Sequence, residues 1–88
     1  MKIVWDEPKR RANVAKHGLD FSDLTLDFFE GALVIGARRP RWKAIGLLDD
    51  QLVVAVFALL GSEAVAIVSL RRASRMERRF FDERKARR

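Results

Sequence analysis

The chain has 88 residues, a formal net charge of +6, 49% hydrophobic residues and 34% charged residues. That balance excludes a disordered chain, and the length predicts one small domain over residues 1–88. The absence of cysteine excludes disulfides and thiolate metal sites. No apolar run approaches the roughly 20 residues needed to span a bilayer and no signal peptide opens the chain, so we expect a cytoplasmic location.

The N-terminal part of the sequence predicts a strand followed by two helices and a weak strand. Residues 2–5 form a short apolar run, and residues 6–18 form a helix in which Pro8 suits the first turn and Gly18 the end. A second helix is expected over 21–31, with Ser22 as its N-cap. The weak strand follows and runs into a basic loop that ends at Pro40.

The C-terminal half predicts an antiparallel meander followed by a last helix. Three apolar runs are separated by Asp49-Asp50 and by Gly61-Ser62, which are typical of short hairpin turns. The last helix begins at a capping box formed by Ser74 and Glu77. The sequence therefore predicts an α+β fold, with an antiparallel sheet of about four strands, two N-terminal helices packed on one face and a C-terminal helix.

Two-residue turns would place Leu60 opposite Glu63 and divide the meander into two different faces. One face would be apolar throughout, with Val68 and Leu70 on its last strand. The other would have an apolar floor, including Val65 and Ile67, with cations at its borders. If only water covered this second face, its apolar side chains would be exposed to solvent with no stabilising contact. We therefore expect either the C-terminal helix or a partner to cover it.

The positive charge is concentrated at the end of the chain. Residues 71–88 hold nine basic and three acidic side chains, a net charge of +6, whereas residues 1–70 are balanced. A localised basic segment is typical of a protein that binds a polyanion, although such tails are also often only solvated surface. We expect Lys16, Arg75, Arg78 and Arg79 to contact RNA phosphates if the polyanion is RNA.

The borders of the second face hold the candidate catalytic cations Arg41, Lys43 and Arg71. Strand geometry puts Lys43 about 16 Å from Arg71, which suits several phosphates along one strand. The candidate groups for gaining or losing a proton are His17 and Glu77. Each has another interpretation: His17 can interact with a helix C-terminus, and Glu77 can be only a capping residue.

The stretch WDEPKRRANVAKHGLDF is the most specific motif in the sequence. It contains the pattern W-D-x-x-K-x-x-x-N-x-x-K-H-G-x-x-F, in which Lys9, Asn13 and Lys16 or His17 rise on one helix face. This pattern, with RWKAIG at 41–46 and SLRRA at 69–73, resembles the BrnT family of toxins from bacterial toxin–antitoxin pairs. The resemblance extends over nearly the whole chain. One departure is Phe81, which stands where a tyrosine is usual in the family.

The resemblance implies a RelE-like fold and endoribonuclease activity, and our expectation is metal-independent RNA transesterification that inhibits translation and growth. In that reaction Arg41, Lys43 and Arg71 would stabilise the negative charge of a pentacovalent phosphorane. His17 or Glu77 would accept or donate the proton. The resemblance also implies a cognate antitoxin of the ribbon-helix-helix type, here expected in a heterotetramer of two toxins and two antitoxins that reaches operator DNA only through the antitoxin. No cofactor or metal is expected, since a single histidine and no cysteine cannot form a ligand cluster. The alternatives are a non-catalytic basic binding module, or a decayed toxin kept as a co-repressor.

Overall fold

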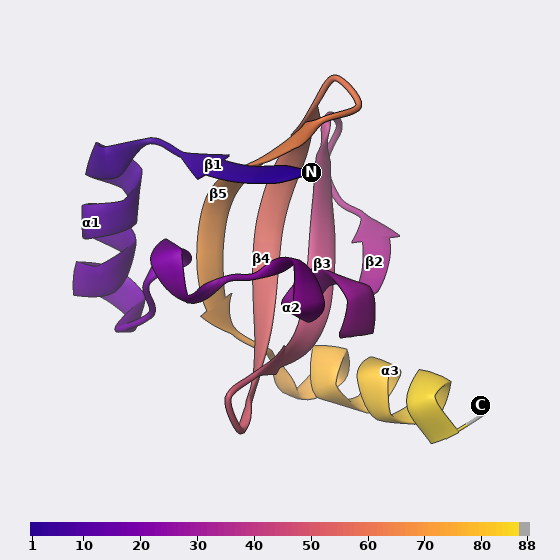
Figure 1. The fold of residues 1–88 in the computed structure, drawn as a ribbon. Coiled ribbons are helices and arrows are strands. Elements are labelled where there is room, and N and C mark those ends of the chain that lie inside the picture. The colour runs from indigo at the N-terminus through magenta and orange to yellow at the C-terminus, as the bar shows by residue number, and fades with distance from the viewer. Residues whose placement is uncertain (87–88) are drawn as a thin grey trace.

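Five strands, three α-helices and one 3-10 helix follow one another along residues 1–86, the part of the chain that this computed structural model describes (Figure 1). The predicted last helix is present, although its final two predicted residues, 87–88, lie outside that part. The elements are β1 (Lys2–Trp5), α1 (Glu7–His17), the 3-10 helix (Phe21–Asp23), α2 (Leu26–Gly31), β2 (Leu33–Gly36), β3 (Arg41–Leu48), β4 (Gln51–Leu60), β5 (Ala64–Arg72) and α3 (Arg75–Ala86).

The region predicted as one helix over 21–31 is divided into two short helices. The first is held by Asp20, whose carboxylate accepts hydrogen bonds from the backbone and hydroxyl of Ser22. The second begins at Thr25, whose hydroxyl accepts a hydrogen bond from the backbone N–H of Phe28 at 3.3 Å. Ser22 is therefore not the N-cap of a long helix, because Leu24 and Thr25 are extended between the two caps.

The strands form one sheet in the order β1-β5-β4-β3-β2. Strands β2 to β5 are antiparallel to their neighbours, as predicted, but β1 adds a parallel strand beside β5. The expectation of about four antiparallel strands was therefore wrong in two details. The sheet has five strands and is mixed, because β1 pairs in parallel with β5 at one edge.

The two hairpins of the meander differ in how well the sequence predicted them. Leu48 pairs with Gln51, as expected for a two-residue turn. Leu60 pairs with Ala64 rather than Glu63, and the register shifts again where Phe57 pairs with Ile67 but Val56 pairs with Ser69. This second shift is a β-bulge that leaves Val68 as the extra residue.

The register shift and the bulge decide which face each residue of β5 occupies. The longer turn places Val65 and Ile67 on the face opposite to the predicted one. The bulge then reverses the alternation, so that Leu70 and Arg71 return to the faces predicted for them. The two errors in the predicted register cancel at the C-terminal end of β5, which is where the candidate site lies.

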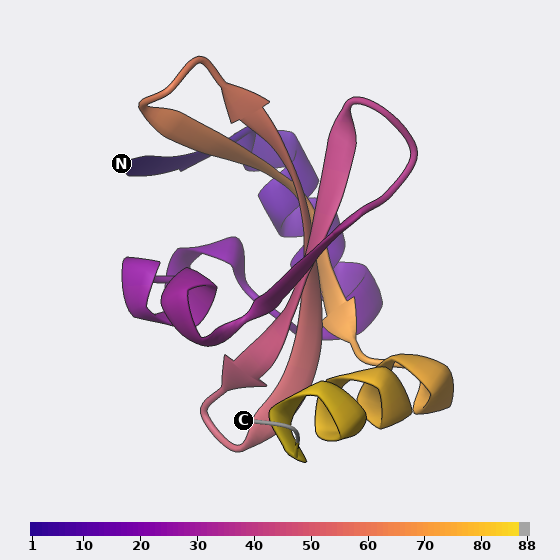
Figure 2. The same cartoon turned by 90° about the vertical axis from the view of Figure 1, so that its right-hand side faces the viewer.

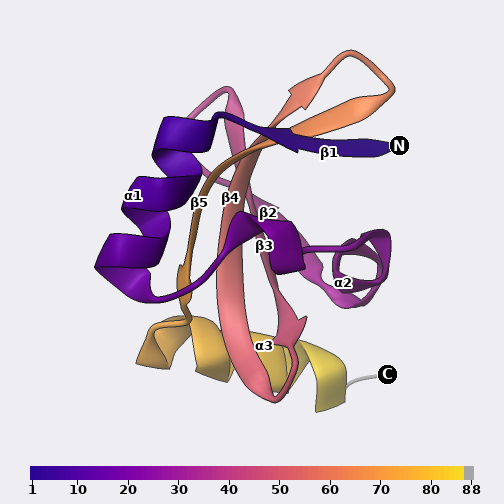
Figure 3. The ribbon, with the colours of Figure 1, turned by 60° about the vertical axis from the view of Figure 1, so that its left-hand side comes forward.

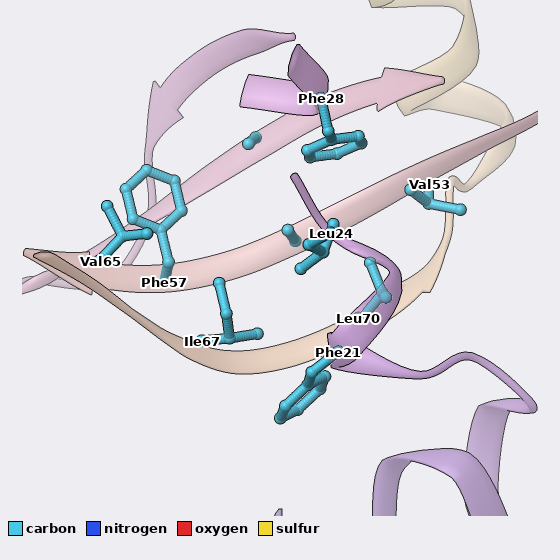
Figure 4. Close-up of a cluster of buried hydrophobic side chains, with 10 residues drawn as sticks. Phe21, Leu24, Phe28, Val53, Phe57, Val65, Ile67 and Leu70 are labelled. Carbon is cyan, nitrogen blue, oxygen red and sulfur yellow. The ribbon is translucent and has the colours of Figure 1, made fainter. Parts of the chain in front are cut away.

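One face of the sheet, which we call the α2 face, holds the larger core. The close-up of this core in Figure 4 shows side chains from the 3-10 helix and α2 packed over strands β4 and β5. Phe29 also stacks edge-on against Phe57, with ring centroids 5.3 Å apart. The buried members of the core are Phe21, Leu24, Phe28, Ala44, Val53, Ala55, Phe57, Val65, Ile67 and Leu70.

The opposite face, which we call the α3 face, is covered in part by the C-terminal helix. Phe81 is buried and packs with Ile45, Leu52 and Val54, while Phe80 packs at the border of this second cluster. In Figure 2, where the strands are seen nearly edge-on, α2 and the beginning of α3 lie on different sides of the sheet. Of the two expected covers, the C-terminal helix is therefore the one present in this chain.

Helix α1 lies beside the sheet rather than on a face of it, which corrects the expectation of two N-terminal helices packed together on one face. Figure 3 shows it running along β5, beyond the point where β1 ends. Its buried residue is Asn13, whose amide donates to the carbonyl of Leu70 at 2.8 Å and accepts from the N–H of Leu70 at 3.1 Å. The side chain thus replaces a neighbouring strand at this edge.

Candidate active site

The three predicted catalytic cations share the α3 face. Arg41, Lys43 and Arg71 pair with Ala58, Val56 and Val54 of β4, which alternate along one strand and therefore point to one side. The prediction that these cations lie on one face is confirmed. Their positions on the two strands that flank β4 are set by the β3–β4 hairpin and by the bulge in β5.

Two of these cations converge on one carboxylate. Lys43 Nζ donates to Glu77 Oε2 at 3.0 Å, and the guanidinium of Arg71 donates to both Glu77 oxygens, at 2.8 and 2.9 Å. The prediction that Lys43 and Arg71 are spread over about 16 Å is wrong for their charged groups, since both reach the same anion. The arrangement is a compact, two-cation site for one tetrahedral or planar anion.

Glu77 also forms the predicted capping box of α3. Its Oε1 accepts from the backbone N–H of Ser74 at 2.8 Å, and its own N–H donates to the Ser74 hydroxyl at 3.2 Å. The hydrogen bonds from Arg71, followed by those from Ser74 and Lys43, hold the pKa of Glu77 far below its usual range. The carboxylate is therefore ionised at neutral pH, and Glu77 is a poor proton acceptor while both cations remain on it.

The cluster is shielded but reachable from solvent. The side chain of Glu77 is 12% exposed, whereas those of Lys43 and Arg71 are 27% and 32% exposed. Two cations against one carboxylate leave a net positive charge in the cluster. The pKa of Arg71 is raised, chiefly by its hydrogen bonds to Glu77, so its guanidinium keeps its charge at any physiological pH.

Arg41 lies two residues before Lys43 on the same face and is exposed at the start of β3. With Arg39 and Trp42 it lines a cavity of about 500 Å³ at the β2–β3 connection. The structure thus places Arg41 beside the two-cation cluster but in a separate hollow.

His17 and Lys16 lie on α1, away from the two-cation cluster. Together with Lys9 and Asn13 they line a depression of about 250 Å³ that is closed on the other side by Val68 and Ser69 of β5. The predicted helix stripe of Lys9, Asn13 and Lys16 or His17 is therefore present. Within residues 1–86, no hydrogen bond joins His17 to Lys43, Arg71 or Glu77.

The remaining predicted RNA-binding residues share the outer surface of α3. Arg75, Arg78 and Arg79 are exposed and line a shallow groove of about 280 Å³ with Asp82 and Glu83. The two carboxylates offset part of the positive charge there. The inner side of the helix is fixed by its phenylalanines, and Arg84 and Lys85 lie over their rings at 4.8 and 5.5 Å from the centroids.

Asn13 has a role in the site that the sequence alone did not predict. It holds both backbone groups of Leu70, the residue immediately before Arg71, and donates a further hydrogen bond to the Leu19 carbonyl at 2.9 Å. The available signal was an asparagine among the motif residues, on a helix stripe that is otherwise charged. A buried amide of this kind fixes the backbone from which Arg71 projects.

Two other features are absent from the described part of the chain. No helix in residues 1–86 combines the length and apolar character needed to cross a membrane. Over the same residues, no group of three histidine, cysteine, aspartate or glutamate side chains is arranged to hold a metal ion.

Comparison with known proteins identifies the class to which this fold and site belong. The family model described as "Ribonuclease toxin, BrnT, of type II toxin-antitoxin system" matches residues 5–77. The crystal structure of the Brucella abortus ribonuclease toxin BrnT is similar, with a TM-score of 0.81 and 47% sequence identity. That match covers 85% of this chain and 99% of the Brucella chain. No curated protein matches the sequence.

The chain is thus a ribonuclease toxin of a type II toxin–antitoxin system by class. It belongs to the BrnT family. Membership of such a system implies an antitoxin partner. The matched residues include the whole of α1, Lys43, Arg71 and Glu77, so the two-cation cluster and the depression beside α1 both lie within the family region.

Proposed function

We propose that this protein is a metal-independent endoribonuclease whose reaction centre is the cluster of Lys43, Arg71 and Glu77. The observation that supports this most directly is the convergence of two cations, at 2.8–3.0 Å, on one carboxylate. A carboxylate oxygen and a phosphate oxygen accept the same charge-assisted hydrogen bonds. In this proposal Glu77 occupies the position that the scissile phosphate takes when RNA binds.

The proposed step is transesterification. The 2′-oxygen forms a bond to phosphorus while the bond from phosphorus to the 5′-oxygen breaks, which leaves a 2′,3′-cyclic phosphate and a free 5′-hydroxyl. Lys43 and Arg71 stabilise the negative charge that grows on the phosphorane oxygens. Once the phosphate takes over these cations, Glu77 loses the hydrogen bonds that depress its pKa and accepts the 2′-hydroxyl proton. Water at the exposed rim supplies the proton for the 5′-oxygen.

The remaining site residues have supporting roles in this proposal. Arg41 extends the positive surface on the same strand as Lys43, and Arg75, Arg78 and Arg79 attract RNA over the outer surface of α3. His17 is the alternative proton carrier. If His17→Ala has the same kcat as wild type across the pH range, His17 does not transfer the proton. Such activity would inhibit translation and growth by degrading RNA.

RNA cleavage in the presence of a chelator tests the proposal. We expect the purified protein to degrade RNA in EDTA, and Arg71→Ala to lower kcat/KM by about 100-fold or more. Arg72→Ala is the matched control, because Arg72 is the next residue of β5, is exposed and points to the opposite face. Intact RNA with folded wild-type protein, or equal losses in the two variants, would reject the proposal.

We further propose that the antitoxin is of the ribbon-helix-helix type, that it binds as two copies with two toxins, and that operator DNA is reached only through it. The exposed arginines of α3 favour an acidic segment of the antitoxin that competes with RNA. Co-expression with a neighbouring small reading frame, followed by light scattering of the complex, measures the partner and its stoichiometry.

The competing function is a non-catalytic module that acts only as a co-repressor with the antitoxin. The closed state of the cluster favours it, because Glu77 neutralises one of the two cations in the free protein. Phe81, buried at the place where the family usually has a tyrosine, offers no hydroxyl for proton transfer. Growth arrest on expression without the antitoxin separates the two, since only the nuclease would cause it.

A further inference from the structure

The depression between α1 and β5 is a second cationic feature, separate from the Lys43–Arg71–Glu77 cluster. Lys9 and Lys16 are exposed at its rim, and the half-buried ring of His17 forms part of its wall. Asn13, at its base, already has its amide fully engaged with the backbone of Leu19 and Leu70. Among residues 1–86, no carboxylate lines this depression, in contrast to the groove on α3.

The depression is connected to the two-cation cluster by strand β5. Ser69, which lines the depression, pairs with Val56, and Val56 also pairs with Lys43, so Ser69 lies on the α3 face. Arg71 follows two residues later on the same face, about 7 Å along the strand. Between the two sites the α3 face is only half-buried. Helix α3 packs instead on the part of this face formed by Ile45, Leu52 and Val54.

The β-bulge at Val68 makes this connection possible. Before the bulge, Val65 and Ile67 turn their side chains into the core of the α2 face; after it, Ser69 and Arg71 turn theirs to the α3 face. Without the extra residue, Ser69 would continue the alternation of Ile67 and lie in the core. Bulges are frequent beside active sites, where they re-aim side chains.

We propose that this depression binds the backbone phosphate of a nucleotide next to the cleaved one in single-stranded RNA, with Lys9 and Lys16 as the cations that hold it. The inference rests on the nuclease function proposed above. The short distance along β5 from Ser69 to Arg71 matches neighbouring phosphates of one extended strand. Among residues 1–86, no carboxylate in the depression competes with such an anion. His17 then contributes an N–H donor or a flat ring surface to the same nucleotide instead of carrying the reaction's proton.

A salt titration of RNA binding tests this subsite. The probe is a fluorescent single-stranded RNA in which every 2′-oxygen is methylated, because such RNA cannot undergo transesterification. We expect the double variant Lys9→Gln/Lys16→Gln to bind it more weakly and to lower the slope of log K against log salt by about 0.7 for each phosphate that is no longer neutralised. Both lysines are exposed, so the fold should be unchanged, and the circular dichroism spectrum checks this.

The matched control is Lys2→Gln/Arg11→Gln, which removes the same charge from exposed positions outside the depression. An equal change of slope in both double variants, or no change in either, would overturn the subsite.

Cleavage kinetics separate this result from the nuclease proposal. The Lys9/Lys16 variant should raise KM for long RNA several-fold with little change in kcat, whereas Arg71→Ala should lower kcat/KM by about 100-fold or more. If wild-type protein cleaves no RNA, the nuclease proposal fails, and the subsite, which rests on it, falls with it.

Discussion

The two faces of the sheet are built by different means. The α2 face is closed by an apolar core from the 3-10 helix and α2. The α3 face has a smaller apolar cluster around Phe81, and its border is fixed by an ionic cluster in which one carboxylate holds two cations. The comparison teaches that apolar packing and ion pairing are divided across one sheet, because neighbouring residues of β5 point to opposite faces.

Leu70 and Arg71 give the sharpest test of this division. Leu70 is fully buried in the α2 face, so Leu70→Ala should lower the free energy of unfolding by about 3–5 kcal/mol. Arg71→Ala leaves the shielded Glu77 carboxylate with Lys43 and Ser74 as partners and should cost about 1–2 kcal/mol, less than Leu70→Ala, while activity falls. Urea unfolding followed by circular dichroism measures both. Similar losses of stability in the two variants would contradict the division.

Asn13 marks the boundary between the faces, and its removal should have the next largest effect. Asn13→Ala leaves the N–H and carbonyl of Leu70 without their side-chain partners at a buried edge. We expect the free energy of unfolding to fall by about 2–4 kcal/mol. Arg11→Ala, an exposed change on the same helix, serves as the control and should stay within about 0.5 kcal/mol of wild type.

The ionic cluster gives the α3 face a dependence on pH through the carboxylate of Glu77. The pKa of Glu77 is lowered in the folded protein, mainly by Arg71, from a usual value of 4.5. Its contribution to stability is therefore full above pH 4.5 and is lost as the pH falls below that value toward the folded pKa. The difference in unfolding free energy between wild type and Glu77→Gln should be largest near neutral pH and should shrink in acid. A difference that stays constant from about pH 7 to about pH 3 would contradict this.

The smallest expected effects concern the helix caps, one on each side of the sheet. Thr25→Ala removes a single cap bond of α2, whereas Ser74→Ala removes half of a reciprocal capping box on α3. Each should cost about 1 kcal/mol, and the loss at Ser74 should be the greater because the hydroxyl there belongs to a reciprocal pair with Glu77. Thermal unfolding measures both losses of stability, and a greater loss for Thr25→Ala than for Ser74→Ala would contradict this prediction.

Much of the fold could be predicted because the apolar runs and turn residues fix the local elements. The strands of the meander and the capping box of α3 follow from periodicity and spacing alone. The register of β5 cannot be predicted in this way, because either of its two possible faces would bury apolar side chains on the α2 face. One register buries Val65 and Ile67 there, and the other buries Ala64 and Ala66. Only the larger volumes of valine and isoleucine, packed against Phe57, favour the observed register, and that preference depends on the three-dimensional core.

The candidate site was predictable in its residues but not in its connections. Strand alternation placed Arg41, Lys43 and Arg71 on one face, and the spacing from Ser74 identified Glu77 as a cap. Sequence spacing cannot show that the same carboxylate reaches both cations, since that depends on where α3 crosses the sheet. The position of β1 beside β5 was missed for a similar reason, because a parallel pairing leaves no hairpin signal in the sequence.

Glu77 is both the anion held by Lys43 and Arg71 and a capping residue of α3, so occupancy of the site is coupled to the first turn of that helix. Any anion that takes over Lys43 and Arg71 releases the carboxylate from two of its partners, and the first turn of α3 then depends on Ser74 alone. We therefore expect anion binding at the sheet to increase fraying at the start of this helix. Amide exchange at residues 74–78 would register an occupied site even when no bond has been cut.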